Sequence, residues 1–316
     1  MKALRTSLIS IALLLATVCT AQEKVYFTRE ITPEALVRIY KALGKEATGR
    51  VAVKISTGEP GGHNYLKPDL IRDLVSEVGG TIVECNTAYG GRRSRTEDHL
   101  RAIHDHGFDT IATCVIMDAE GEMRIPVQDT SHLQYDIVGQ ELANYNFVVN
   151  LAHFKGHQMG GFGGVLKNQS IGVASANGKA YIHSAGYTDS PRECWRHRTE
   201  QDDFLESMAA AAQAVHNYLK GNVVYINVMN NMSVDCDCDS HPAAPRLKDM
   251  GILASLDPVA VDQAGLDMVF NHQAAPGDDE KPLIERINRQ HGTYITDYAE
   301  QIGLGSKSYI LVDLDE

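Results

Sequence analysis

VAVKI at residues 51–55, PDLIRDLVSEV at 68–78 and TIVEC at 81–85 decide the fold class of this chain. The first and third segments are short apolar runs rich in β-branched residues, which are typical of buried strands. In the middle segment the apolar residues recur at the spacing of one helical face, and Gly79-Gly80 ends the helix. Strand, helix and strand in this order predict a βαβ unit with parallel strands.

The same alternation continues along the chain. Further strands are expected at 110–117, 147–151, 223–228 and 308–312, and further helices at 96–106, 202–220 and 258–270. The helix at 202–220 ends at Gly221, and Asp257-Pro258 supplies an N-cap followed by proline in the first turn. We therefore expect an α/β fold: a mixed or mostly parallel sheet flanked by helices, in a single large domain (22–316) with a loop-rich middle.

The first 21 residues are typical of a secretory signal peptide. Lys2 and Arg5 form a basic start, residues 11–18 are apolar but too few to span a bilayer, and Cys19-Thr20-Ala21 offers small residues before Gln22. We expect cleavage after Ala21 and export to the periplasm or the extracellular space. Acylation of Cys19, which would anchor the chain to lipid, is the less favoured alternative. No later segment is long and apolar enough to suggest an integral membrane helix.

Charge argues against one class of partner. The 316 residues carry a formal net charge of −12, and loss of Lys2 and Arg5 with the signal peptide makes the chain more acidic still. Proteins that bind nucleic acids need a basic surface to neutralise phosphates. We therefore expect no nucleic-acid partner, and the sequence gives no indication of the oligomeric state.

The segment DCDCDSH at 235–241 concentrates candidate metal ligands, namely Asp235, Cys236, Asp237, Cys238 and His241. Thiolates and carboxylates this close repel one another unless a cation neutralises them or water solvates them. Sulfur together with imidazole suits zinc or iron. A metal site is the favoured interpretation. A Cys236–Cys238 disulfide and a solvated acidic loop are the alternatives.

HFKGH at 153–157 and the glycines after it form a second candidate site. The segment follows the strand expected at 147–151, where ligand sites of parallel sheets gather, and its glycines favour a loop. The candidate acid–base groups are His153, His157 and His63, with Lys155 beside them. Amides and cations of such a loop suit an anionic substrate, and the candidate substrate-binding residues are Gly161, Gly163, Gly164, Lys167, Asn168 and Arg92. A turn with solvated lysines is the alternative.

The remaining cysteines and histidines are expected to be structural. Cys85 and Cys114 lie within apolar strand segments and are predicted to be buried and inert. His99, His104 and His106 lie in or next to the helix at 96–106 and are predicted to be on its surface.

Taken in order, these motifs resemble the domain-of-unknown-function 362 family, whose members are often called iron–sulfur centre proteins. The resemblance runs from about residue 50 to 270. It rests on GGH (61–63), NTAYGGR (86–92), HL (99–100), HGF (106–108), HFKGH (153–157), GFGG (161–164), KN (167–168), CDC (236–238) and ILASLDPVAVD (252–262). It implies that Cys236-Asp237-Cys238 is a family motif, and it points towards redox chemistry.

The chain departs from many relatives that it resembles, which carry a ferredoxin-like insert with two cysteine-rich clusters after the segment equivalent to 178–183. Here that region contains only Cys194, and no Cys-x-x-Cys-x-x-Cys run occurs in the sequence. A chain exported unfolded cannot carry a preassembled cluster, and a twin-arginine pair is missing from its start. An iron–sulfur cluster is therefore less expected than a single zinc or iron ion.

These features favour an exported metal-dependent enzyme that acts on a small anionic substrate, with redox chemistry slightly preferred to hydrolysis. A non-catalytic metal-binding protein of the cell envelope is one alternative. An interaction protein that contains a disulfide and binds no metal is the other.

Overall fold

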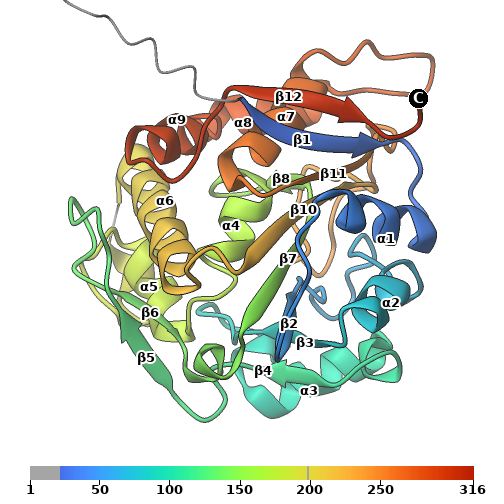
Figure 1. Ribbon diagram of the computed structural model, residues 1–316. Helices are drawn as coiled ribbons and strands as arrows, with labels where there is room; N and C mark the ends of the chain where they lie inside the picture. The colour runs from blue at the N-terminus through green and yellow to red at the C-terminus, as the bar shows by residue number, and fades with distance from the viewer. Residues whose placement is uncertain (1–21, 198) are drawn as a thin grey trace, which may run out of the picture.

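The computed structural model describes residues 22–197 and 199–316, and one eight-stranded sheet crosses it from β12 to β4 (Figure 1). The order of neighbouring strands is β12-β1-β11-β10-β7-β2-β3-β4. In that order they span Tyr309–Asp313, Glu23–Thr28, Gly251–Ser255, Val223–Met229, Phe147–His153, Val51–Lys54, Gly80–Glu84 and Cys114–Ile116. The predicted signal peptide, residues 1–21, lies outside the described residues.

Strand direction confirms the predicted fold class. β10, β7, β2, β3 and β4 run parallel to one another. β11 is antiparallel to both of its neighbours, and β12 is parallel to β1. Parallel neighbours need crossover connections, which place helices against the sheet. The fold is α/β, with a mixed, mostly parallel sheet flanked by helices in a single domain.

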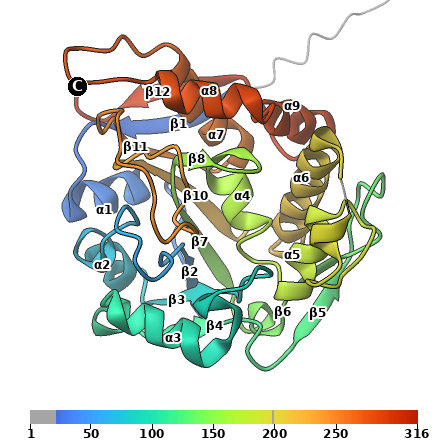
Figure 2. The same cartoon turned by 180° about the vertical axis from the view of Figure 1, so that it is seen from behind.

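Helices cover both faces of the sheet (Figures 1 and 2). One face carries α1 (Pro33–Ala42), α2 (Pro68–Glu77) and α3 (Thr96–Asp105). The other carries α4 (Val165–Gln169) and α7 (Pro258–Phe270). Outside these two pack α5 (Ala176–His183), α6 (Gln201–Tyr218), α8 (Lys281–Arg289) and α9 (Tyr294–Gln301).

The alternation of side chains along β2 shows why both faces are apolar. Val51 and Val53 belong to the core beneath α1 and α2, whereas Ala52 belongs to the core that α6 and α7 cover. Helices on both faces leave no solvated side, so a central strand reads as a continuous apolar run. Lys54 ends this strand and, although its side chain is charged, only 2% of the residue is exposed. A buried lysine here marks the edge of the sheet where polar groups gather.

The expected helices at 68–78, 96–106, 202–220 and 258–270 are confirmed as α2, α3, α6 and α7. Asp257 caps α7 as predicted, because its Oδ1 accepts the amide hydrogens of Val259 and Ala260. The strand expected at 110–117 is shorter and begins at Cys114, since Phe108–Thr110 forms a 3₁₀ turn. The sequence patterns did not predict β1, α1 or β11.

The loop predicted after residue 153 is wrong. β7 continues through His153, and β8 (Lys155–His157) then pairs with β9 (Gly161–Gly163) in a hairpin. The glycines serve close packing: a Cβ on Gly161 would lie 2.8 Å from the Cα of Gly292, and one on Gly164 would lie 2.2 Å from Oδ1 of Asp262. Glycine permits such approaches because it has no side chain, so its abundance here does not indicate a loop.

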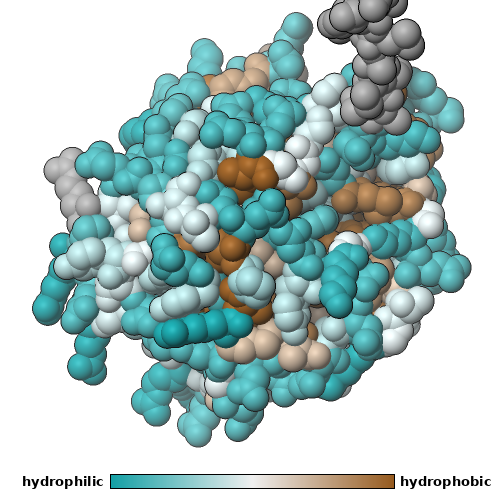
Figure 3. All heavy atoms as spheres, turned by 60° about the vertical axis from the view of Figure 1, so that its left-hand side comes forward, coloured by the Kyte–Doolittle hydropathy of each residue, from teal (hydrophilic) through white to brown (hydrophobic). Residues whose placement is uncertain are grey.

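The surface seen from the side of α5 and α6 is mostly hydrophilic, and hydrophobic residues appear there in small, separate groups (Figure 3). Within residues 22–197 and 199–316, no helix has the length and apolar character needed to cross a membrane.

Asp136 carries a buried carboxyl group with few partners. It begins β6 (Asp136–Gly139), which pairs with β5 (Glu122–Ile125), and it is fully buried. Its Oδ1 accepts the amide hydrogen of Ile137, but Oδ2 meets no hydrogen-bond donor in the described part of the chain. Burial raises the pKa of Asp136 from 3.8 to about 7. The folded protein therefore holds this proton more tightly than the unfolded chain does.

We predict that Asp136→Asn stabilises the protein, and more so at alkaline pH. The raised pKa of Asp136 costs nothing below the unfolded value of 3.8, and the cost grows until pH passes the folded value of about 7. The gain in unfolding free energy should be roughly 2–4 kcal/mol larger at pH 8.5 than at pH 4.5. Urea unfolding of both proteins at both pH values measures it. An equal gain at the two pH values would contradict the buried-acid explanation.

Candidate functional site

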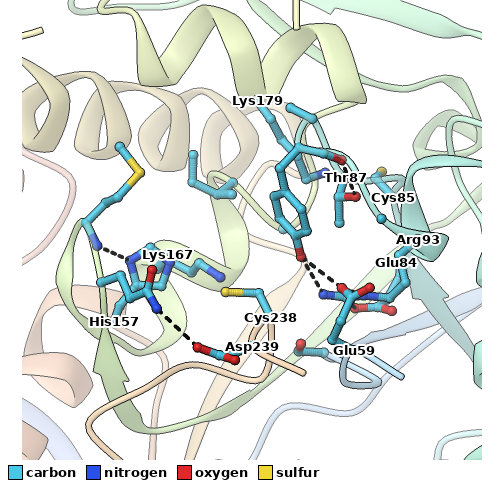
Figure 4. Close-up of a pocket in the computed structure, with 18 of the residues that line it drawn as sticks. Glu59, Glu84, Cys85, Thr87, Arg93, His157, Lys167, Lys179, Cys238 and Asp239 are labelled. Carbon is cyan, nitrogen blue, oxygen red and sulfur yellow. Dashed lines mark hydrogen bonds and ion pairs between the residues drawn. The ribbon is translucent and has the colours of Figure 1, made fainter. Parts of the chain in front are cut away.

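A cavity of about 660 Å³ lies at the carboxyl-terminal edge of the parallel strands (Figure 4). Segments that follow β2 and β3 form one side of it, including Glu59, Thr87 and Arg93. The end of β8, α4, α5 and the segment between β10 and β11 close the rest. A pocket of this size accommodates a small organic molecule, and this sheet edge is where α/β proteins usually bind ligands.

Cys236 and Cys238 lie in the segment between β10 and β11, which we call the cysteine loop (residues 230–243). Cys236 is buried and Cys238 lines the cavity. Their sulfur atoms are bonded as a disulfide, with Cα atoms 5.2 Å apart. A ring nitrogen of His157 and the two sulfurs also lie within 4.8 Å of one another. When the disulfide is reduced, the two thiols and His157 offer converging metal ligands.

The carboxylate of Asp237, between the two cysteines, points away from this cluster. Its Oδ1 lies 2.9 Å from Nδ1 of His153, and its Oδ2 lies 2.8 Å from Nζ of Lys155. All three side chains are buried. Burial alone would raise the pKa of Asp237, but the positive charges and hydrogen bonds of His153 and Lys155 hold it well below its usual range. Asp237 therefore anchors the cysteine loop as a buried anion.

His153, at the end of β7, and Lys155, at the start of β8, form the other half of this anchor. Nε2 of His153 lies 2.6 Å from the carbonyl oxygen of Asn230, so both ring nitrogens face oxygen atoms. Lys155 also donates to the carbonyl oxygen of His153. Neither side chain lines the cavity. The predicted acid–base role for His153 and Lys155 finds no support in this arrangement.

Gly156 explains why the cysteine loop can lie directly on β8. Its amide donates to the carbonyl oxygen of Ser233 at 2.8 Å. A Cβ at Gly156 would lie 2.2 Å from the carbonyl oxygen of Val234, well inside contact distance. On the other side of the loop, the amide of Glu59 donates to the carbonyl oxygen of Asp237. The loop is thus held between β8 and the segment after β2.

His157 is oriented by the turn that follows it. Its Nδ1 accepts the amide hydrogens of Gly160 at 2.8 Å and Met159 at 3.3 Å. Burial, reinforced by the positive charge of Lys167, holds the pKa of His157 well below its usual value. The ring is therefore neutral. Because Nδ1 is an acceptor, the ring proton resides on Nε2.

Three lysines give the cavity a positive lining. Lys54 donates to Asn168 and to the carbonyl oxygen of Ile55, and Lys179 donates to the carbonyl oxygen of Ala174. Lys167 makes no hydrogen bond or ion pair within the described residues, and Figure 4 shows it beside His157. Burial lowers the pKa of Lys54 to about 8 and that of Lys167 to about 7, the latter with help from neighbouring lysines. An anion in the cavity would relieve this crowding.

The opposite wall is a network of paired charges. Nε of Arg93 lies 2.8 Å from Glu59, and Nη1 lies 3.5 Å from Glu84. Tyr89 donates to Glu59, and Nε2 of His99 lies 2.8 Å from Glu84. These pairs satisfy one another and keep the wall in place. His99 is fully buried, so its predicted surface position is wrong: its partner is a carboxylate on the adjacent strand.

The structure brings some of the predicted site residues together and separates others. His157, Lys167, Asn168, Arg92 and Cys238 line the cavity. Gly161, Gly163 and Gly164 are buried in packing and do not line it. His63 and His241 are exposed and lie outside the cavity lining. Asp235 is engaged elsewhere, by Arg286 and the amide of Ala243.

Several cavity residues were absent from the predicted site, including Lys54, Glu84, Lys179 and His183. Lys54 and Glu84 carried a usable signal, because each is a charged residue at the end of an otherwise apolar strand segment. Lys179 and His183 had none, since α5 was not predicted. Cys85 agrees with its prediction: it is buried, and burial raises the pKa of its thiol to about 12.

Comparison with known proteins places the chain in a family. The model described as Domain of unknown function (DUF362) matches residues 51–267, more than half of the chain, so the chain belongs to this family. The match includes β2, the hairpin of β8 and β9, and the cysteine loop. No curated protein matches the sequence.

Two solved structures are similar to part of the chain. The lactate racemase apoprotein from Thermoanaerobacterium thermosaccharolyticum is 15% identical, with a TM-score of 0.43 over 77% of this chain and 56% of that one. A structural-genomics protein from Thermotoga maritima is 11% identical, with a TM-score of 0.40 over 85% of this chain and 58% of that one. This chain thus spans less than two thirds of either, and neither likeness supports an argument about function.

We predict that Gly156→Ala displaces the cysteine loop and destabilises the fold. The added methyl group meets the backbone of Val234, which cannot rotate away as a side chain would. The expected loss in unfolding free energy is about 1–3 kcal/mol, measured by urea unfolding. Gly90→Ala is the matched control, because a Cβ there has nothing within 4 Å. Equal stability of the two variants would contradict the close approach.

Proposed function

We propose that the chain is a metal-dependent enzyme that acts on a small anionic molecule bound in the cavity. The observation that carries the proposal is the convergence of His157, Cys236 and Cys238 within 4.8 Å, at the wall of a cavity with a lysine lining. Export, zinc or iron as the metal, and a preference for redox chemistry are part of the proposal and rest on the sequence features. The two alternatives, a non-catalytic metal-binding protein and an interaction protein that contains a disulfide, do not require the lysines.

The donor set fits a single zinc or iron ion better than a cluster. Two thiolates and one imidazole leave a coordination position free, which is typical of catalytic rather than structural sites. Cys238 lines the cavity, so a metal held by the pair would be accessible from it. A cubane iron–sulfur cluster needs four thiolates, and within the described residues Cys85, Cys114 and Cys194 do not join the pair.

His157 sets a condition on metal binding. Its Nδ1 accepts from Gly160, so the ring proton must move from Nε2 to Nδ1, or the ring must turn, before a ring nitrogen can bind a cation. The two thiols must also lose their protons. Metal uptake should therefore release protons and grow stronger as pH rises. We assign the larger share of the affinity to the two sulfurs and a smaller share to His157.

When bound, the metal would act as a Lewis acid or, as iron, exchange an electron with the substrate. The chain's own groups would do the rest. Lys167 would bind the anionic part of the substrate. Asp237, through His153 and Lys155, would hold the sulfurs in position. The paired wall of Glu59, Glu84 and Arg93 would keep its shape because its charges already have partners.

The Cys236–Cys238 disulfide favours a second candidate, a protein of the same fold that uses the pair only as a disulfide and binds no metal. The two candidates differ in one respect that can be measured. A reduced pair would bind zinc or iron under the first and would remain metal-free under the second.

We predict that the reduced protein, without residues 1–21, binds stoichiometric zinc or ferrous iron and that the oxidised protein binds neither. Reduction frees two thiols, and oxidation removes both as ligands. Elemental analysis after dialysis, before and after anaerobic reduction, measures this. Metal-free reduced protein would overturn the proposal in favour of the disulfide candidate.

Matched variants locate the site. Cys236→Ser/Cys238→Ser should abolish metal binding, whereas Cys194→Ser, which removes another buried thiol, should not. His157→Ala should weaken the metal affinity by about tenfold or more, which corresponds to about 1.4 kcal/mol. His104→Ala removes an exposed imidazole and should leave it unchanged. Equal losses in the two histidine variants would remove His157 from the ligand set.

A further inference from the structure

Two nitrogen atoms in the cavity lack partners. Nζ of Lys167 forms no hydrogen bond or ion pair with any other described residue, although the lysine lines the cavity. His183 also lines the cavity: its Nδ1 is buried without a hydrogen-bond partner, and its Nε2 makes no hydrogen bond within the described part of the chain. Buried polar groups are normally satisfied, so two such nitrogens at one cavity indicate a missing ligand.

The other cations around the cavity are already satisfied. Arg93 pairs with Glu59 and Glu84, and Lys155 pairs with Asp237. Lys54 and Lys179 donate to oxygens of the chain. Among the described residues, Lys167 is therefore the cavity cation whose Nζ has neither a hydrogen bond nor an ion pair. An uncompensated charge in such a site is costly unless a ligand of opposite charge binds to it.

His183 is fixed in position by its neighbours. Its ring stacks on Phe204, with centroids 4.7 Å apart, and lies 5.2 Å from the ring of Trp195. Burial, with the charges of Lys167 and Lys179, lowers the pKa of His183 to about 3, so the ring is neutral. Because Nδ1 is buried, the neutral ring can donate one hydrogen bond into the cavity when its proton is on Nε2.

We propose that Nζ of Lys167 and Nε2 of His183 together bind an oxyanion, a carboxylate or phosphate group, of an organic molecule. This inference rests on the proposed function and names the group by which the substrate is held. The cavity volume of about 660 Å³ far exceeds a bare phosphate, so the anion belongs to a larger molecule. Ile171, Met159 and Trp195 also line the cavity and offer apolar contact for the remainder.

Trp195 provides the measurement. It is the only tryptophan of the chain, and it lies against His183 at the cavity wall. Its fluorescence can be followed while the protein is titrated with inorganic phosphate, acetate, butyl phosphate and butyrate. We expect a saturable change with phosphates or with carboxylates, whichever group the site takes. The butyl compound of that series should bind more tightly than its short counterpart. A linear, unsaturable response to all four would overturn the proposal.

Variants test the two nitrogens. Lys167→Met should weaken binding of the preferred anion by about tenfold or more, and Lys167→Arg should restore most of it, because the positive charge returns. His183→Phe keeps the stacking on Phe204, loses the donor and should weaken binding several-fold. Lys24→Met removes one exposed positive charge and should change nothing. Equal affinity in Lys167→Met and Lys24→Met would contradict the proposal, and thermal unfolding of each variant checks that it is folded.

The inference and the proposed metal site can fail separately. The anion site contains no cysteine, so Cys236→Ser/Cys238→Ser should still bind the anion while it binds no metal. Anion binding without metal would leave the oxyanion site standing and the metal-dependent function rejected. Metal binding without saturable anion binding would reject the oxyanion site and leave the metal site standing.

Discussion

The buried carboxylate of Asp237 is the constraint on which the candidate site depends. Moving a carboxylate out of water costs on the order of several kcal/mol, and only close partners offset it. Here Lys155 and His153 supply those partners from the end of β7 and the start of β8. This cost makes the position of the cysteine loop specific, because any other position would break the buried ion pair of Asp237 and Lys155. With Asp237 held by these partners, its two neighbours Cys236 and Cys238 lie close to His157.

The packing around this ion cluster explains residues whose role in the motif is otherwise obscure. In HFKGH, the first histidine and the lysine hold Asp237, the glycine lets the cysteine loop lie on β8, and the last histidine faces the sulfurs. The first four residues of the motif therefore hold the cysteine loop in place, and only the last one, His157, belongs to the proposed metal site. The same hairpin lies next to α4, which carries Lys167, so the metal ligands and the unpaired cation are positioned by neighbouring elements.

Much of the fold follows from the sequence, because apolar periodicity reports burial on the sheet and on helix faces. β2, α2, β3 and α6 were predictable in this way, and so were the candidate residues His157, Lys167, Cys236 and Cys238. The direction of the Asp237 carboxylate was not, since it depends on a lysine and a histidine more than 80 positions away. The hairpin of β8 and β9 was hidden by its glycines, which indicate close packing here and turns elsewhere. His183 becomes a site residue only because α5 folds back onto the cavity.

X-ray absorption spectroscopy of the reduced, zinc-loaded protein tests the central claim most directly. Two sulfur neighbours at about 2.3 Å and at least one nitrogen neighbour at about 2.0 Å would agree with Cys236, Cys238 and His157 as ligands. Cys236→Ser/Cys238→Ser should then lose the sulfur shell. A spectrum with only oxygen and nitrogen neighbours, or with four sulfurs, would contradict the account.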